Sequence, residues 1–460
     1  MSLNPRVSGR VAARAQHSPA AGMVQRFSPF FALGEISGGP LLVASLIALV
    51  AVNSPWGGAF EAIWDGVLRL SYADLEIGMS LAKWINDGLM PLFFLIIGTE
   101  VKREFVKGSL SSLKSAVLPL AGAIGGLVIP IACFLAINFG QSTSHGWGIV
   151  AAMDTAFSLA IVGVFGTRLP VTVRGILLGF AAIDDVFGLL VIAFAYTPTF
   201  HPWYLGVAAG AFAGILGLQR LRWVSSPPYV VLGILVWIGV LGSGVHPTIA
   251  GVAVGLLLPT TSRLSERRFV ERVQRPIDKV KEAAMAASEA DDASEADAHC
   301  RQAQRGLGYI HEMAAATDEA ASRLIRVLTP WVSYVVLPLF ALSNIRVRFA
   351  PELLADAWQA PLAAGIIVGL AIGKPVGFLF FTWLAVRLRL AVLPEAMTWT
   401  AMAGIGGVAG IGFTLSFFIA ELAFSDQVQS EVAGLAIFSA SLLAAFAGFG
   451  LFSLAARKEA

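Results

Sequence analysis

Charged residues and cysteines are both scarce in this 460-residue sequence. Only 13% of the residues are charged, whereas soluble globular domains carry about 25%, so an ordinary soluble multidomain protein is excluded. The two cysteines, Cys133 and Cys300, are too few for a disulfide framework. Cys133 lies in an apolar run and Cys300 in a charged segment, so no bond between them is expected.

The sequence also lacks a charge excess and the motifs of a soluble enzyme. Its 32 basic and 30 acidic residues leave a net charge of +2, which gives no reason to expect a nucleic acid partner. Outside the apolar runs there is no phosphate-binding loop, metal-ligand cluster or nucleophile motif. We therefore expect neither an enzyme nor a resident cofactor.

Apolar residues, by contrast, are abundant: they make up 57% of the chain and fall into long runs. A membrane-spanning helix needs about 20 predominantly apolar residues. The runs predict an all-α polytopic membrane protein with about 12 transmembrane helices. The predicted spans are residues 38–54, 82–100, 115–138, 147–166, 174–196, 203–218, 228–244, 246–259, 329–345, 360–384, 396–420 and 431–455.

The basic residues between the spans predict how the chain is oriented. With the N-terminus inside, the inner segments hold 27 Lys and Arg and the outer segments 4. Because basic residues favour the cytoplasmic side, both termini are predicted to be cytoplasmic, in the inner (plasma) membrane of a cell. Residues 1–36 are polar, with four arginines and no acid before Glu35. A transit peptide would share this composition, but a disordered cytoplasmic tail is the simpler interpretation.

A charged segment interrupts the series of spans. Residues 260–328 hold twelve acidic and eleven basic residues, and 282–320 are rich in Ala, Glu and Asp. This composition favours soluble helix and suggests a helical hairpin, which is either a tolerated insertion or a regulatory element. The predicted organisation is therefore a tail at 1–36, spans 1–8 within 37–259, an insertion at 260–328, spans 9–12 within 329–456, and a cytoplasmic end at 457–460.

Four charged residues lie deep inside predicted spans. They are Asp154, Asp184, Asp185 and Lys374. At 1.5 Å per residue, Asp154 lies about 10 Å from the start of its span, and Asp184 and Lys374 each about 15 Å from the inner face. Because a charge at this depth is costly, such residues are functional candidates. A static salt-bridge network is the alternative, but three acids and one base would leave it with unbalanced charge.

The same four residues could form a site where a cation and a proton compete. Asp184 and Asp185 point about 100° apart on a helix, so one could meet Asp154 and the other Lys374. Carboxylate oxygens suit small hard cations. Two carboxylates repel each other when both are ionised, so proton uptake would compete with cation binding. Lys374 could neutralise the remaining carboxylate and release a proton when the cation binds.

Other polar groups stand near the ends of spans. Glu100, Arg103 and Glu104 lie where the second span leaves the membrane, either as interfacial ion pairs or as a gating or pH-sensing group. His246 begins the short eighth span, as an ordinary buried polar group or as a pH-responsive element.

Glycines interrupt the eleventh span. Gly406, Gly407, Gly410 and Gly412 fall within residues 404–412. Their spacing fits close helix packing or a broken helix that faces a cavity. Paired interrupted spans mark the ion site of inverted-repeat transporters. The fourth and eleventh spans are candidates for that pair, because spans 3–5 and 10–12 would be inverted relative to each other.

Six motifs in order resemble the NhaA family of Na⁺/H⁺ antiporters. They are Gly-Thr-Glu-Val-Lys-Arg-Glu, Ala-Ala-Met-Asp-Thr-Ala-Phe, Ala-Ile-Asp-Asp-Val, Ser-Gly-Val-His-Pro-Thr-Ile-Ala-Gly, Gly-Lys-Pro-Val-Gly and Gly-Ile-Gly-Phe-Thr-Leu-Ser. Each motif alone is weak, but the ordered set covers nearly the whole membrane part. The resemblance implies twelve spans, two broken and crossing helices (4 and 11), and alternating access.

The resemblance also implies roles for particular residues. Asp154, Asp184 and Asp185 would bind the transported Na⁺ or Li⁺ and the proton, and Lys374 would pair with Asp184 or support the bound state. Exchange would be electrogenic, Glu100, Glu104 and His246 would belong to the pH response, and the protein would work as a homodimer in the lipid bilayer.

Two departures from the family pattern are visible. Met153 replaces the usual Thr before the span-4 aspartate, and residues 323–331 lack the titratable groups common before span 9. Ion preference and pH dependence could therefore differ from those of the family. A sodium-coupled symporter for an organic anion on a related fold is the second hypothesis. A cation channel is a third, but no repeated filter sequence is present.

Overall fold

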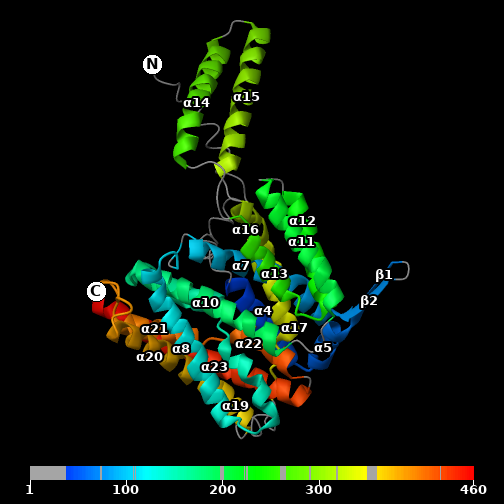
Figure 1. Ribbon diagram of the computed structural model, residues 1–460, viewed down its shortest axis with the longest axis vertical. Coiled ribbons are helices and arrows are strands. Elements are labelled where there is room, and N and C mark those ends of the chain that lie inside the picture. The colour runs from blue at the N-terminus through cyan, green and yellow to red at the C-terminus, as the bar shows by residue number, and fades with distance from the viewer. Residues whose placement is uncertain are drawn as a thin grey trace. The chain divides into compact units, whose positions relative to one another are not determined.

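The computed structural model is built almost entirely from helices (Figure 1). It describes residues 38–72, 75–106, 108, 110–196, 201–221, 223, 226–259, 266–289, 292–317, 320–349, 360–424 and 426–459. The predicted tail at 1–36 lies outside the described residues. Cys133 and Cys300 are both free cysteines, as expected.

Every predicted span coincides with a helix or a series of consecutive helices. Within the described residues, eight are long and apolar enough to cross a membrane, or nine if the bent pair α4 (Gly38–Val52) and α5 (Gly57–Asp65) counts as one. The all-α membrane-protein class is thus confirmed. In chain order the elements are α4 (Gly38–Val52); α6, η2 and α7 (Leu81–Lys83, Trp84–Leu89, Met90–Val106); α8 (Leu113–Ile137); η3, α9 and η4 (Ser142–Ala151, Thr155–Phe165, Gly166–Arg168); α10 (Val171–Ala195); α11 (Pro202–Arg220); α12 (Ser226–Ser243); α13 (Thr248–Leu257); α16, η5 and α17 (Ala320–Trp331, Val332–Val336, Leu337–Asn344); α19, η6 and α20 (Pro361–Ile367, Val368–Gly373, Lys374–Arg387); α21 and α22 (Trp399–Ala409, Phe413–Ala423); and α23 (Gln427–Glu459).

The helices gather into two compact units, which are described separately. The first comprises the described residues within 1–64, 117–184 and 337–460, and the second those within 65–116 and 185–336. Both units are assembled from distant parts of the sequence. The boundary within α10 falls between Asp184 and Asp185.

In the first unit, α23 packs against α9, α19, α21 and α22, and α20 packs against α21. Glycines let backbones approach closely here: a Cβ on Gly125 of α8 would lie 2.1 Å from the carbonyl oxygen of Gly377 of α20. Such contacts between small residues hold membrane helices together where no hydrophobic effect drives association. The core is filled by fully buried aromatic rings, including Phe134, Phe378 and Phe418.

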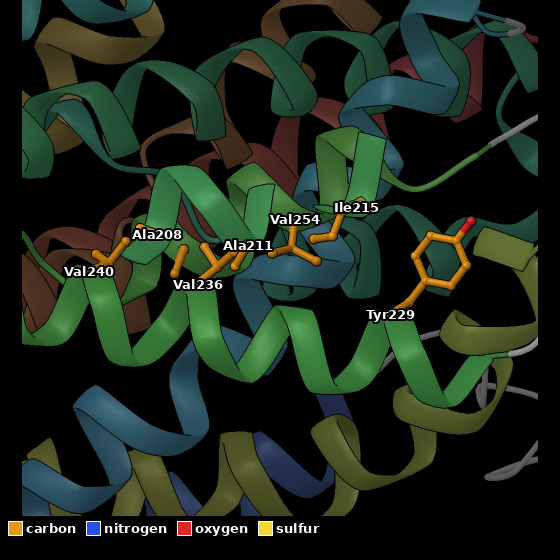
Figure 2. Close-up of a cluster of buried hydrophobic side chains, with 8 residues drawn as sticks. Ala208, Ala211, Ile215, Tyr229, Val236, Val240 and Val254 are labelled. Atoms are coloured by element: carbon orange, nitrogen blue, oxygen red, sulfur yellow. The ribbon is translucent and has the colours of Figure 1, made fainter. Parts of the chain in front are cut away.

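In the second unit, α13 packs along α7, and α11 packs along α12. Gly251 of α13 lies directly against the backbone of Pro91, where a Cβ would be 2.1 Å from the carbonyl oxygen. Small and branched side chains of α11, α12 and α13 form a buried cluster, among them Ala208, Ala211, Val236 and Val254 (Figure 2).

The second unit also contains the one sheet among the described residues, a β hairpin that the helical expectation omits. Its strands β1 (Val67–Tyr72) and β2 (Leu75–Ser80) are antiparallel, with Val67 opposite Ser80. In the chain this hairpin follows α5, which belongs to the first unit except for Asp65.

The charged insertion folds into two helices, α14 (Glu266–Glu289) and α15 (Ala293–Thr317). They pack side by side, so the hairpin suggested by the composition is present (Figure 1). α16 begins at Ala320, nine residues before the predicted ninth span at 329. The hydropathy pattern misses this part of α16 because Arg323 and Arg326 interrupt its apolar residues.

Candidate functional site

The fourth span is interrupted at Asp154. The 3₁₀ helix η3 ends at Ala151, α9 begins at Thr155, and the residues between are extended. Asp154 is the N-cap of α9: its Oδ1 accepts hydrogen bonds from the amides of Ala156 (3.1 Å) and Phe157 (3.2 Å). Aspartate is a favoured N-cap because its carboxylate satisfies amides that have no partner within the helix.

The eleventh span is interrupted at Gly410–Gly412. α21 ends at Ala409 and α22 begins at Phe413. A Cβ on Gly410 would lie 2.4 Å from the carbonyl oxygen of Leu370, and one on Gly412 would lie 2.1 Å from Ser416 Oγ. Both positions therefore exclude a side chain unless a neighbour moves.

The other two glycines predicted for the break lie inside helix α21 instead. A Cβ on Gly407 would lie 2.8 Å from the Cα of Gly448, and one on Gly406 would lie 3.2 Å from the carbonyl oxygen of Pro375. Gly406 and Gly407 thus serve close helix packing, whereas Gly410 and Gly412 belong to the break. Spacing alone could not separate the two uses, since the glycines form one run.

The two breaks cross each other. The Asp154 amide donates to the carbonyl of Ile411 at 2.6 Å, and Ser158 Oγ donates to the carbonyl of Val408 at 2.9 Å. Ser416 Oγ donates to the carbonyl of Ile149 at 2.8 Å. Backbone groups left without helical partners at one break are therefore satisfied by the other, as irregular backbone inside a membrane protein requires.

Asp154 is the centre of this crossing. Its Oδ2 accepts bonds from the amide of Thr414, at 3.1 Å, and from the Thr414 hydroxyl. The carboxylate thus caps the N-termini of both α9 and α22, where the helix dipoles favour negative charge. With two bonds on each oxygen, its acceptor positions are all in use.

Thr414 lies in the Gly-Ile-Gly-Phe-Thr-Leu-Ser motif, and the sequence alone does not indicate its role. Met153, which precedes Asp154 and is 1% exposed, has no hydroxyl to donate to that aspartate. Thr414 supplies a hydroxyl to the same aspartate from the other broken helix. The detectable signal is a hydroxyl residue placed two positions after a glycine break.

Lys374 supplies the opposite charge. It follows directly after the π-helical segment η6 and is completely buried. Its Nζ donates to Asp184 Oδ2 at 2.8 Å and to the carbonyl of Ala151 at 2.6 Å. Ala151 is the last residue of η3, so the ammonium lies at the negative end of that helix.

The two aspartates of α10 are both buried, at 1% exposure for Asp184 and 8% for Asp185. Of the two arrangements that the sequence left open, Asp184 is the residue that pairs with Lys374. Asp184 Oδ1 has no hydrogen-bond partner among the described residues. No group of three His, Cys, Asp or Glu side chains in the described part of the chain could hold a metal ion.

The residues proposed for pH response lie within the second unit. Arg103, near the end of α7, donates from Nη2 to Ser322 Oγ of α16, and Glu100 and Glu104 lie on the same last turns. Between them, Lys102 Nζ donates to the carbonyls of Leu257 (3.2 Å) and Leu258 (2.7 Å), at the C-terminus of α13.

His246 is buried and lies near an aspartate that the sequence analysis missed. Its Nδ1 lies 2.9 Å from Thr248 Oγ1, and its Nε2 lies 3.7 Å from Asp87 Oδ1. Asp87 is 7% exposed and belongs to the π-helical segment η2. The sequence does not single out Asp87, because it lies only five residues after the start of the predicted span at 82, where a charged residue is common.

Comparison with known sequences identifies the family. The sequence profile described as Na⁺/H⁺ antiporter 1 matches residues 28–452. The chain is 37% identical over 436 residues to Na(+)/H(+) antiporter NhaA 2 of Sorangium cellulosum, covering 94% of this chain and 90% of that protein. It is 38% identical over 429 residues to Na(+)/H(+) antiporter NhaA of Rhodopirellula baltica, covering 92% and 93%. The chain therefore belongs to the NhaA family of Na⁺/H⁺ antiporters, as its motifs indicated.

Proposed function

We propose that this protein exchanges Na⁺ or Li⁺ for H⁺ across the membrane by alternating access, with Asp184 and Asp185 as the principal groups for which cation and proton compete. The observation that carries this proposal is the fully buried Lys374–Asp184 ion pair, 2.8 Å long, in which Asp184 Oδ1 has no partner among the described residues. A structural ion pair gains most when all its oxygens are satisfied. A carboxylate with a spare buried oxygen suits an exchange of partners.

In the proposed step, the incoming cation takes the place of the Lys374 ammonium beside Asp184. Lys374 then loses its bond to the Asp184 carboxylate in a dry environment and releases its proton. If one carboxyl group releases a second proton, two protons exchange for one Na⁺ and each cycle moves one net charge. This is how the pair supports electrogenic exchange.

Asp154 has a different role in this proposal. Because its oxygens already accept bonds from α9 and from Thr414, it neutralises the helix ends and keeps the crossing together. It would contribute an oxygen to the cation only when Thr414 moves away. The crossing is then the element whose two arrangements open the site to alternate sides.

The remaining parts of the proposal follow the family pattern. Glu100, Arg103, Glu104 and His246 would adjust activity with pH, and the protein would act as a homodimer in the inner membrane with both termini in the cytoplasm. A symporter for an organic anion is less well supported. Lys374, the only Lys or Arg among the buried residues described, is already bonded to Asp184.

The test uses inside-out vesicles from a host that lacks its own antiporters. An acid-inside proton gradient is imposed and read with a fluorescent amine, and Na⁺, Li⁺ or K⁺ is then added across a series of pH values. We expect Na⁺ or Li⁺ to collapse the gradient with the unaltered chain and not with Asp185→Asn. If well-expressed unaltered protein responds to no cation at any pH, the exchange proposal is wrong.

A further inference from the structure

The α14–α15 hairpin has the inner packing of an antiparallel coiled coil. With the exception of Ala286, its least exposed side chains recur at alternating spacings of three and four residues, the pattern of heptad positions a and d. These seam residues are Phe269, Val273, Pro276, Val280, Ala283 and Ala287 on α14, and His299, Ala303, Gly306, Ile310 and Met313 on α15.

Gly306 fixes the register between the two helices. A Cβ on Gly306 would lie 2.4 Å from Val280 Cγ2 and 4.0 Å from the carbonyl oxygen of Pro276. Gly306 is therefore level with the turn of α14 between Pro276 and Val280. Leu307 follows Gly306, and Ile277 follows Pro276. Leu307 and Ile277 therefore lie at the same height along the hairpin.

A second apolar row runs beside this seam. Each member follows a seam residue by one position, which is heptad position e, and in an antiparallel pair the e positions of both helices lie on the same side. We call this row the lateral stripe. It consists of Val270, Ile277 and Ala284 on α14 and Cys300 and Leu307 on α15.

The large residues of the lateral stripe are well exposed within one copy of the chain. Val270 is 62% exposed, Ile277 40% and Leu307 55%. Their seven-residue spacing repeats about every 10 Å along the helices. Contiguous exposed apolar rows of this kind mark interaction sites on proteins.

The charges of the hairpin avoid the lateral stripe. The neighbouring b positions include Gln274, Lys281, Asp297 and Gln304, which are half neutral. The c, f and g positions hold most of the charged side chains, namely Glu271, Arg272, Arg275, Asp278, Lys279, Glu282, Arg301 and Arg305. Depletion of charge is a compositional sign of the core of an interface.

We propose that the lateral stripe packs against the lateral stripe of a second copy of this chain, so that two hairpins form a four-helix bundle. A two-fold axis parallel to the hairpins places α14 of one copy against α15 of the other at equal heights. Ile277 then faces Leu307 of the partner, and Ala284 faces Cys300, so each layer pairs residues of similar size. The described residues at the neighbouring b positions are neutral or basic on α14 and neutral or acidic on α15. Where α14 of one copy lies against α15 of the other, no two charges of the same sign therefore meet.

The test uses full-length protein in its membrane. In a background with Cys133→Ser and Cys300→Ser, one tagged copy carries Ile277→Cys and a second, differently tagged copy carries Leu307→Cys. Mild oxidation should join the two copies by a disulfide. The control pair replaces Ile277→Cys with Met285→Cys. Met285 is 63% exposed but occupies position f, away from the stripe, and should give at least tenfold less product.

Three outcomes would overturn the proposal. These are no disulfide between the stripe cysteines, an equal yield from the Met285→Cys control, and labelling of the stripe cysteines by a bilayer-dissolved reagent in place of copy-to-copy bonding. The last would show that the stripe lies on lipid. Since the cysteine substitutions could disturb the hairpin, each variant must first match the background in expression and thermal unfolding. A second cross-link joins Ala284→Cys in one copy to the native Cys300, restored in the other copy. The double substitution Ile277→Glu with Leu307→Glu should abolish this cross-link. The control Met285→Glu should preserve it.

Discussion

The amide of Asp154 donates to the carbonyl of Ile411 across 2.6 Å, which joins the two broken helices through their backbones. Because this bond uses only the backbone N–H, any residue except proline could make it at position 154. The carboxylate of Asp154 adds what the backbone cannot: a negative charge shared by the N-termini of α9 and α22.

The Thr414 hydroxyl should stabilise this crossing measurably. Thr414→Val keeps the shape of the side chain but removes one donor to a buried carboxylate. Hydrogen bonds to charged groups contribute about 1.5–3 kcal/mol, so the free energy of unfolding should fall by about that amount. Thermal unfolding in detergent checks the loss. Thr414→Ser, which keeps the hydroxyl, should recover most of the stability, and equal loss in both variants would contradict this role.

Lys374 and Asp184 should show strong energetic coupling. Lys374→Met leaves a buried carboxylate without its partner, and breaking one side of a buried pair costs about 3–5 kcal/mol. Adding Asp184→Asn to Lys374→Met removes the unpaired charge and should restore much of the stability. A double-mutant cycle by thermal unfolding measures the coupling. Additive effects would show that the two groups do not interact.

Gly410 should tolerate a side chain less well than Gly412. Alanine at 410 would place its Cβ 2.4 Å from a backbone oxygen of Leu370. Alanine at 412 meets the side chain of Ser416, whose hydroxyl can rotate away at the loss of its bond to the carbonyl of Ile149. Overpacking a close contact costs about 1–3 kcal/mol, so Gly410→Ala should lower both stability and transport more than Gly412→Ala. Gly450→Ala, at a position with open space, is the neutral control. The prediction fails if the order of the first two is reversed.

Sodium affinity should fall as the medium becomes more acidic. Protons and Na⁺ compete for the same carboxylates in the proposed mechanism, so lower pH protonates the site and raises the apparent KM for Na⁺. With one competing proton, the rise approaches about tenfold per pH unit once the site is mostly protonated. Initial rates of gradient collapse at several Na⁺ concentrations and pH values provide the measurement. A pH-independent KM with a changing maximal rate would instead place the pH effect outside the ion site.

The fold class and the charged candidates were accessible from the sequence because both depend on local patterns. Apolar runs long enough to span a bilayer predicted the helices, and the cost of burying charge drew attention to Asp154, Asp184, Asp185 and Lys374. The run of glycines at 404–412 predicted a break in the eleventh span. These signals need only neighbouring residues, since hydrophobicity and helix propensity act over one or two turns.

The tertiary structure alone decided which groups meet. Lys374 and Asp184 are 190 residues apart, and Thr414 and Asp154 are 260 apart, so their pairing depends on how helices rotate and cross. The same applies to Asp87, whose nearness to His246 has no sequence signal, and to the division of labour between Gly406–Gly407 and Gly410–Gly412. Sequence patterns predict which face of a helix is apolar, but the partner of that face depends on packing among all the helices.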